Sequence, residues 1–197
     1  MGRVQTFDTD TVVRAARSVF WAQGYEGASL PDLERATGLG RSSIYHAFGS
    51  KRGLFDVAVA SYLDEVIRPR LAPLVAETVA AGAITDYFVG LRAALARRGA
   101  AENGCLLINT AGAPVANDPA VAAVISGYRA DLHRALAAGV AAHDPALGSV
   151  ERDQLATLLT SLVVTAMTLV RVDPAQSAAV MDAALRLLGD PTAATVA

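Results

Sequence analysis

Residues 37–51 read Thr-Gly-Leu-Gly-Arg-Ser-Ser-Ile-Tyr-His-Ala-Phe-Gly-Ser-Lys, and the interpretation of the whole chain rests on this stretch. Ile44 and Phe48 are four residues apart, which puts them on one face of a short helix. The segment before it starts at Ser29 with a Ser-x-x-Asp pattern, typical of a helix N-terminus, and stops at Gly38. Two short helices joined by a glycine-containing turn of three to four residues predict a helix-turn-helix.

The outward face of the second helix of this pair collects hydrogen-bond donors. Ser42 and Ser43 are small enough to let the helix lie deep in a DNA major groove, and Arg41 suits a bidentate contact with guanine. The Tyr45 hydroxyl suits a phosphate oxygen, and His46 adds a further donor. This set of side chains predicts a surface that meets double-stranded DNA.

Two cations, Lys51 and Arg52, stand in the first turn of the next predicted helix. The helix dipole makes this end positive, so each cation is unfavourable by roughly 0.3–1 kcal/mol unless an anion lies nearby. A DNA phosphate at this helix N-terminus would remove the conflict. Side chains that simply extend into water are an equal alternative.

Composition indicates an all-α globular protein. Of 197 residues, 53% are hydrophobic and 18% are charged, with mean hydropathy +0.36 and many alanines, which favour helices. Cys105 is the single cysteine, so no internal disulfide forms. The longest uncharged stretch, 154–170, is too short and too polar for a membrane span. We therefore expect a cytoplasmic protein that does not enter a membrane.

Helix signals divide the chain into about nine helices. The charge is uneven, with seven basic and five acidic residues in the first 55, against ten and fourteen in the remainder. We expect an N-terminal domain at 1–50, with the helix-turn-helix at about 29–48, and a C-terminal helical domain at 51–197. The expected helices span 8–24, 29–38, 41–48, 51–81 (interrupted by Pro69 and Pro73), 84–98, 103–113, 119–142, 150–170 and 173–188.

The first 55 residues resemble the N-terminal domain of TetR-family transcription regulators. The resemblance is carried by Phe20, Gly24-Tyr25, Ser29-Leu30, Gly38, Leu39, Ser43, Ile44, Tyr45, Phe48, Ser50 and Lys51. Two positions depart from the family pattern. Gly40 replaces the serine that caps the recognition helix, and Ala47 replaces a histidine or tyrosine that contacts phosphate.

The resemblance implies a set of DNA contacts and a partner. The partner is double-stranded operator DNA, expected to be palindromic. The implied contact residues are Ser29, Arg41, Ser42, Ser43, Tyr45, His46 and Lys51.

The resemblance also implies a homodimer formed by the last two helices, which carry apolar faces wider than one stripe. The alternative is the core of a monomer. The expected interface residues are Leu155, Leu158, Leu159, Leu162, Val163, Ala166, Val170, Val180, Ala184 and Leu188.

A ligand pocket is implied in the C-terminal domain, for a small-molecule effector of unknown identity. Each candidate residue is also an ordinary core residue by its chemistry, and Cys105 is either a sensor or plain core. No cofactor or metal site is expected. The candidate pocket residues are Tyr62, Tyr87, Phe88, Cys105, Asn109, Tyr128 and Met167.

These observations favour a transcription regulator, a repressor that an effector releases from its operator. An enzyme is the first alternative, but the chain has no nucleophile elbow, zinc-protease or phosphate-loop motif. A helical protein-interaction module that does not bind DNA is the second.

Overall fold

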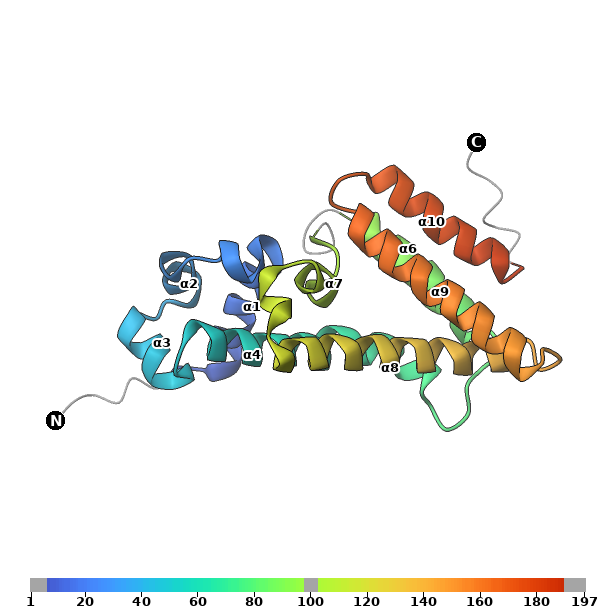
Figure 1. Ribbon diagram of the computed structural model, residues 1–197, viewed down its shortest axis with the longest axis horizontal. Helices are drawn as coiled ribbons and strands as arrows, with labels where there is room; N and C mark the ends of the chain where they lie inside the picture. The colour runs from blue at the N-terminus through green and yellow to red at the C-terminus, as the bar shows by residue number, and fades with distance from the viewer. Residues whose placement is uncertain (1–6, 98–102, 190–197) are drawn as a thin grey trace.

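The computed structural model describes residues 7–97 and 103–189, and these are entirely helical apart from turns and loops, as the sequence predicts. One helix, α5, is a single turn, and the other nine are longer (Figure 1). The helices are α1 (Thr9–Gly27), α2 (Leu30–Thr37), α3 (Arg41–Phe48), α4 (Lys51–Tyr62), α5 (Arg68–Leu71), α6 (Ala83–Leu95), α7 (Leu106–Ala111), α8 (Pro119–His143), α9 (Ser149–Leu169) and α10 (Pro174–Leu187).

The molecule is elongated, with α1, α2 and α3 at one end and α6, α9 and α10 toward the other (Figure 1). We call α1–α3 the head and the remaining helices the body. Helix α1 packs along α4, while α9 packs against both α8 and α10. Helix α7 lies between head and body and contacts α1, α8 and α9. Helix α3 therefore stands at the far tip of the head.

Local signals in the sequence set the ends of the head helices. Ser29 and Asp32 form a reciprocal capping box at the start of α2. Gly38 ends α2 in the left-handed region, with φ of 71°, which an L side chain would resist. Helix α1 continues to Gly27, but its backbone leaves helical geometry at Gly24, where the sequence predicts the helix end.

The head has its own aromatic core. Phe20 on α1 and Phe55 on α4 meet edge to face with ring centres 5.2 Å apart, and Tyr25 packs against Phe55 at 5.1 Å. Leu33 and Ile44 are fully buried in the same core. Because edge-to-face ring pairs add to the gain from burial, this cluster fixes α2 and α3 against α1 and α4.

The corner between α3 and α4 depends on the absence of a side chain at Gly53. A Cβ atom there would overlap the backbone oxygen of Phe48, the last residue of α3. Ser50 caps α4 by accepting a hydrogen bond of 2.9 Å from the Gly53 N–H group. The two helices therefore meet at a distance that only glycine permits.

The path after α4 differs from the single helix predicted for 51–81. Helix α4 passes into a π-helical turn at Leu63–Ile67, then α5, then a 3-10 turn at Ala72–Leu74, and helical structure stops there. Pro69 and Pro73 stand in the first turns of the last two elements, where no backbone donor is needed. The expected helix therefore ends seven residues early.

Hydrogen bonds across the junction hold head and body together. The Trp21 indole N–H donates to the Gly104 carbonyl oxygen at 3.0 Å, and the Val115 amide donates to Glu26 at 2.8 Å. Gly104 has φ of 69°, and a Cβ atom there would overlap the Met167 carbonyl oxygen. The absence of a side chain at Gly104 therefore lets the loop before α7 approach α9, while the Gly104 carbonyl faces the head.

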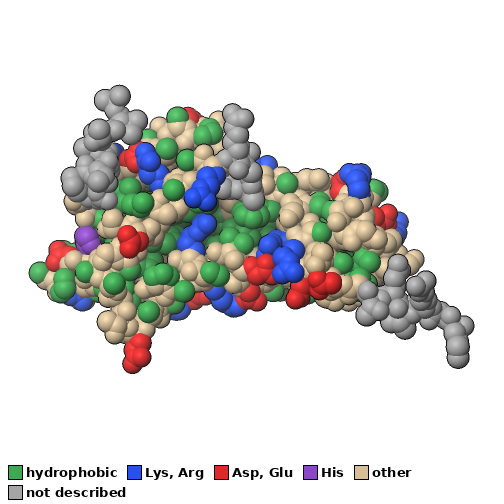
Figure 2. Space-filling model, turned by 180° about the vertical axis from the view of Figure 1, so that it is seen from behind, with side chains coloured by type: hydrophobic (Ala, Val, Ile, Leu, Met, Phe, Trp, Pro, Cys, Tyr) green, Lys and Arg blue, Asp and Glu red, His purple; other side chains and the backbone are tan. Residues whose placement is uncertain are grey.

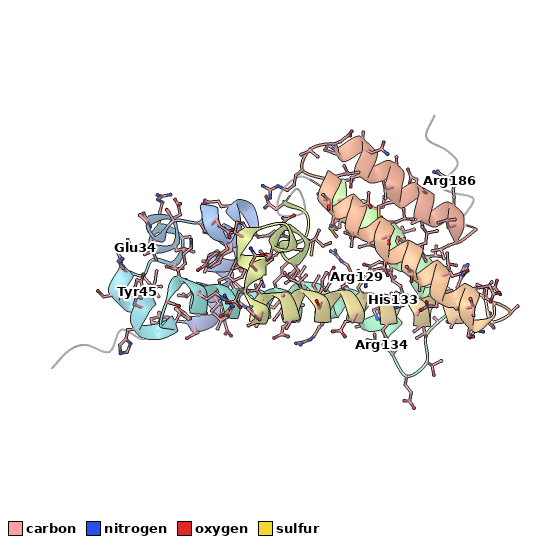
Figure 3. The ribbon with its side chains drawn as sticks, viewed as in Figure 1. Glu34, Tyr45, Arg129, His133, Arg134 and Arg186 are labelled. Carbon is pink, nitrogen blue, oxygen red and sulfur yellow. The ribbon has the colours of Figure 1, made fainter. Side chains whose placement is uncertain are left out.

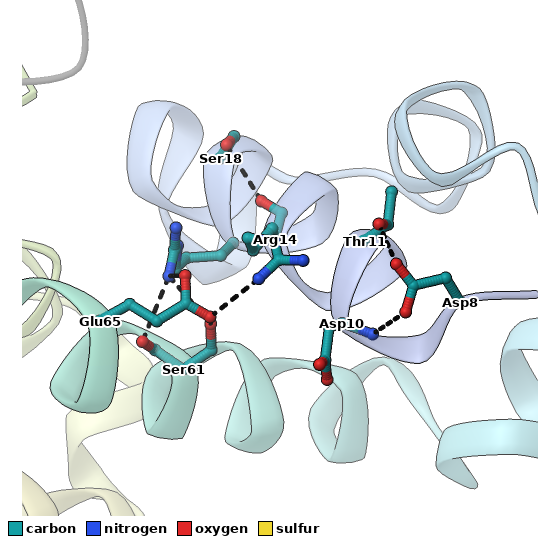
Figure 4. A network of polar contacts seen from close by, with 8 residues as sticks. Asp8, Asp10, Thr11, Arg14, Ser18, Ser61 and Glu65 are labelled. Atoms are coloured by element: carbon teal, nitrogen blue, oxygen red, sulfur yellow. Dashed lines mark hydrogen bonds and ion pairs between the residues drawn. The ribbon is translucent and has the colours of Figure 1, made fainter.

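A second link joins α1 to the end of α4. The Arg17 guanidinium donates to the Ser61 hydroxyl at 2.9 Å and pairs with the Glu65 carboxylate at 3.0 Å. Arg14 pairs with the same carboxylate at 3.4 Å (Figure 4). These contacts place α1 on the π-helical turn as well as on α4.

Replacing Gly53 tests the α3–α4 corner. Gly53→Ala is expected to lower stability by about 1–3 kcal/mol, because backbone must shift to admit the methyl group. Gly127→Ala on α8 is the matched control, since nothing lies within 4 Å of its Cβ position and alanine raises helix propensity. Thermal unfolding measures both, and an equal midpoint for the two variants would contradict the corner's geometry.

The ion pair between Arg52 and Asp118 predicts a pH-dependent difference in stability. Hydrogen bonds from Arg52, then from the Val121 amide, hold the pKa of Asp118 at about 2, below its ordinary 3.8. A depressed carboxyl pKa stabilises the fold above the unfolded value and loses that effect as pH falls through about 2. Asp118→Asn keeps the α8 cap but loses the charge, so it should unfold at a lower temperature at pH 7.

The midpoints of the parent and Asp118→Asn should converge near pH 2. Asp131→Asn is the control, because its ion pair is with Arg134 one turn away on the same helix. If the thermal midpoints of the parent and Asp118→Asn differ as much at pH 2 as at pH 7, the ion pair is not the cause of the difference.

Candidate nucleic-acid interface

The rotation of α3 decides which of its side chains face outward. Ile44 is fully buried and Ser43 is half-buried, whereas Arg41, Ser42 and His46 are exposed. Tyr45 is 38% exposed and lies at the outer end of the head (Figure 3). The donors predicted on this helix therefore share one outward face, supported from behind by the buried Ile44.

Arg41 and Tyr45 lie close together on this face. The Arg41 guanidinium lies 5.6 Å from the centre of the Tyr45 ring, one helical turn away. Among the described residues no carboxylate pairs with Arg41. A cation placed over an aromatic face keeps its donors free, so Arg41 remains available to an acceptor on DNA.

The N-terminus of α3 has no side-chain cap. Gly40 occupies the cap position, and no side chain bonds to the first amide groups of the helix. This is the cap position at which the sequence departs from the family pattern. Uncapped amide groups at a helix N-terminus point outward and favour an anion.

Ser29 and Lys51 occupy different surroundings. The Ser29 hydroxyl accepts from the Asp32 amide at 3.2 Å and also donates to the Asp32 carboxylate, so it already serves the α2 cap. The Lys51 ammonium lies 4.6 Å from the centre of the Tyr25 ring, and no described carboxylate pairs with it. Lys51 is thus half-buried beside the head core with its donors unused.

Arg52 forms ion pairs within the chain, which neither of the two interpretations of the sequence anticipated. Its guanidinium pairs with Asp56 at 2.7 Å and with both carboxylate oxygens of Asp118, at 2.8 and 3.1 Å. Hydrogen bonds to Asp118, then to Asp56, raise its pKa. Asp118 is 66 residues further along the chain, so no local pattern reveals this partner.

Three of the predicted pocket residues meet inside the body. The Cys105 thiol lies 3.8 Å from the Tyr128 hydroxyl, and Tyr62 is also a neighbour of Cys105. Burial, then the neighbouring Cys105, raises the pKa of both tyrosines above the ordinary value. We call Tyr62, Cys105 and Tyr128 the thiol–phenol cluster. It lies next to Gly104, whose carbonyl holds Trp21 of the head.

The other pocket candidates are dispersed around this cluster. Tyr87 and Phe88 pack edge to face with ring centres 5.3 Å apart, and Met167 is buried under Gly104. The Asn109 amide donates to the Asn103 carbonyl oxygen at 2.6 Å, so it closes the start of α7. Tyr87 is an electrostatic neighbour of Cys105 and Tyr128, whereas Asn109 is engaged at the start of α7.

One cavity borders the thiol–phenol cluster and a second borders Tyr87. One, of about 630 Å³, lies between Leu63–Val75 and α8 and has Tyr128 in its wall. The other, of about 520 Å³, lies between Arg70–Ala80 and α6 and has Tyr87 in its wall. Seen from behind, the molecule is hollowed near its middle, over hydrophobic side chains with Lys and Arg nearby (Figure 2). The sequence analysis did not predict Arg70 as a site residue. Its position between Pro69 and Pro73 was the only feature of the sequence that pointed to it.

The predicted dimer residues separate into two groups. Leu158 is 45% exposed, and Leu155, Leu162 and Val180 are half-buried on the outer faces of α9 and α10. The other six face the interior of this one chain, because α9 packs on α8 as well as on α10. They are not accessible to a partner, and they are Leu159, Val163, Ala166, Val170, Ala184 and Leu188.

No helix within 7–97 or 103–189 is both long and apolar enough to cross a membrane. The described side chains also include no group of three or more His, Cys, Asp or Glu that could hold a metal ion.

Known proteins resemble this chain in sequence. Residues 12–58 match the family model described as bacterial regulatory proteins, tetR family. The chain is 39% identical over 122 residues to the uncharacterized HTH-type transcriptional regulator YezE of Bacillus subtilis. It is 34% identical over 109 residues to the HTH-type transcriptional repressor ComR of Escherichia coli. These matches cover 62% and 55% of this chain and 62% and 51% of the two relatives.

Solved structures match over nearly the whole chain. Cysteine mutants of the TetR family transcriptional regulator CifR, in complex with 26-base-pair double-strand operator DNA, superpose with TM-scores of 0.75 and 0.76. Sequence identity is 33% and 32%, and the matches cover 93% and 94% of this chain and 98% of each CifR chain. The chain therefore belongs to the tetR family of bacterial regulatory proteins.

Proposed function

We propose that this chain is a sequence-specific DNA-binding transcription regulator that acts as a homodimer on a palindromic operator. The observation that carries the proposal is the outward face of α3, where Arg41 and Tyr45 stand at the tip of the head without a carboxylate partner. CifR, one of the structural neighbours, is described in complex with operator DNA, which supports the same role here. We assign the protein to the bacterial cytoplasm and give it no catalytic role.

The proposed contacts divide into base reading and phosphate binding. Arg41 and Ser42 stand at the start of α3, where a recognition helix meets base edges in the major groove. Tyr45, His46 and Lys51 surround that point and suit phosphate oxygens. Ser43 is half-buried and Ser29 is engaged in its cap, so both rank below the others as contacts.

The proposed dimer uses the outer faces of α9 and α10. Leu155, Leu158 and Leu162 recur at helical spacing along α9, and Leu187 on α10 is 47% exposed. Pairing these faces about a two-fold axis would form a four-helix bundle and set two α3 helices on successive major grooves. The division at residues 1–50 and 51–197 then separates DNA reading from dimerisation and sensing.

We propose repression that is relieved by a small-molecule effector. An effector bound in the body shifts the dimer toward a form in which the two heads no longer fit one operator. The route to the head runs through Gly104, which lies beside the thiol–phenol cluster and accepts the hydrogen bond from Trp21. A displacement of α7 therefore bears directly on α1.

Two head variants test the DNA contacts. Arg41→Ala is expected to lower operator affinity by about 1–3 kcal/mol and to relax base preference at one position. Lys51→Ala is expected to weaken binding to all duplexes and to reduce the log–log salt slope by about one unit. Binding is measured by fluorescence anisotropy on an operator selected from random duplex DNA, at several salt concentrations.

The control for these variants is Arg134→Ala. Arg134 is an exposed arginine of α8 in the half of the molecule away from Tyr45 (Figure 3). Arg134→Ala should bind the operator like the parent. If Arg41→Ala and Lys51→Ala also bind like the parent, α3 is not the reading helix. If the parent selects no duplex, a protein-interaction module is the better explanation.

One substitution tests the dimer face. Leu158→Arg places a charge on the outer face of α9, so sedimentation velocity should show monomers and operator affinity should fall at least about tenfold. Val75→Arg adds the same charge at a residue that is 61% exposed outside α9 and α10, and it should remain dimeric. A dimeric Leu158→Arg protein would place the interface elsewhere.

A further inference from the structure

Arg70 is an arginine without a partner in the wall of a cavity. It is half-buried in the single-turn helix α5, and no described residue forms a hydrogen bond or ion pair with it. A guanidinium has five N–H donors and stays charged. The Arg70 donors are not enclosed by the chain, so they remain available to an acceptor in the cavity.

Tyr87 borders the same cavity and also lacks a partner. Its side chain is only 9% exposed, and its hydroxyl forms no hydrogen bond with any described residue. Burial raises the pKa of Tyr87 above its ordinary value, and the nearby positive charge of Arg70 opposes the rise. Tyr87 is therefore a neutral donor that stands close to a cation.

The cavity between these two residues has the size and character of a ligand site. Its volume is about 520 Å³, within the range of small-molecule pockets. Pro73 and Ala83 supply accessible apolar surface, and Thr78 adds a hydroxyl. Asp86 is the one acidic residue in the wall, and it is exposed. An anion is therefore favoured near Arg70 and disfavoured near Asp86.

We propose that this cavity binds a small organic monocarboxylate whose carboxylate contacts Arg70 and Tyr87 and whose apolar body lies against Pro73 and Ala83. A planar guanidinium matches a carboxylate in a bidentate way, and the phenol donates a third hydrogen bond. The inference rests on the proposed function, because it names the chemical class of the effector.

The position of this site explains how a ligand bound there affects the head. Tyr87 lies within electrostatic range of Cys105, which follows Gly104 directly in the chain. The Gly104 carbonyl accepts the hydrogen bond from Trp21. A carboxylate that draws Arg70 and Tyr87 together therefore acts on the loop that positions α1.

The test is binding of matched probes to the full chain without DNA. Octanoate and 3-phenylpropionate are each compared with the corresponding alcohol and amine by isothermal titration calorimetry. Both acids are expected to bind with saturation, and each alcohol and amine at least about tenfold more weakly. Equal binding of acid and alcohol, preferred binding of the amine through Asp86, or no binding by either acid would overturn the inference.

Variants assign the binding to this site. Arg70→Met should lower the affinity for octanoate at least about tenfold, and Tyr87→Phe should lower it about threefold. Arg70→Lys should retain part of the affinity. Arg35→Met, on α2, is the matched control, because this exposed arginine lines neither cavity, and it should bind like the parent. An Arg70→Met protein with the parent's thermal midpoint and the parent's octanoate affinity would exclude the site.

Operator binding separates this inference from the proposed function. If the acids bind but leave operator affinity unchanged, the site stands and effector control of repression fails. If the chain binds its operator through Arg41 while neither acid binds, the regulator stands and the carboxylate site fails.

Discussion

The burial of Ile44 is the constraint on which the DNA-reading surface depends. Ile44 is fully enclosed, together with Leu33 and the aromatic pair Phe20 and Phe55. Because one side of α3 must face this core, its opposite side must face outward. Gly53 adds a second restraint by bringing α4 against the last carbonyl of α3. These two restraints fix the rotation of α3 about its axis and its position in the head. Its polar residues therefore point away from the protein.

The packing of α3 bears on the proposed control by an effector. Because α3 is fixed against its core, we expect an effector to act on how the head is held and not on α3 itself. The hydrogen bond from Trp21 to Gly104 and the ion pairs of Glu65 with the arginines of α1 are the contacts in question. Gly104 lies beside the thiol–phenol cluster, and Glu65 belongs to the segment Leu63–Leu74, which lines two cavities. A ligand in either cavity would therefore lie close to these contacts.

Short-range signals made the head predictable from its sequence, whereas the body depends on long-range packing. Ser29, Gly38 and the residues flanking α3 specify their helix ends within a few positions. The sequence could not show which face of α9 is buried within the chain, because both faces are apolar. Periodicity alone does not say which face packs against α8 and which stays on the surface. Arg52 was misjudged as a possible phosphate contact because its partner, Asp118, lies 66 residues away. Arg70 was missed because an unpartnered charge is recognised only when its surroundings are known.

Amide hydrogen–deuterium exchange, with and without an operator duplex selected from random DNA, tests the central claim most directly. If α3 is the element that enters the groove, bound DNA slows exchange at residues 40–51 and leaves 149–169 unchanged. Unchanged exchange at 40–51 in a complex that has formed, with protection elsewhere on the chain, would contradict it.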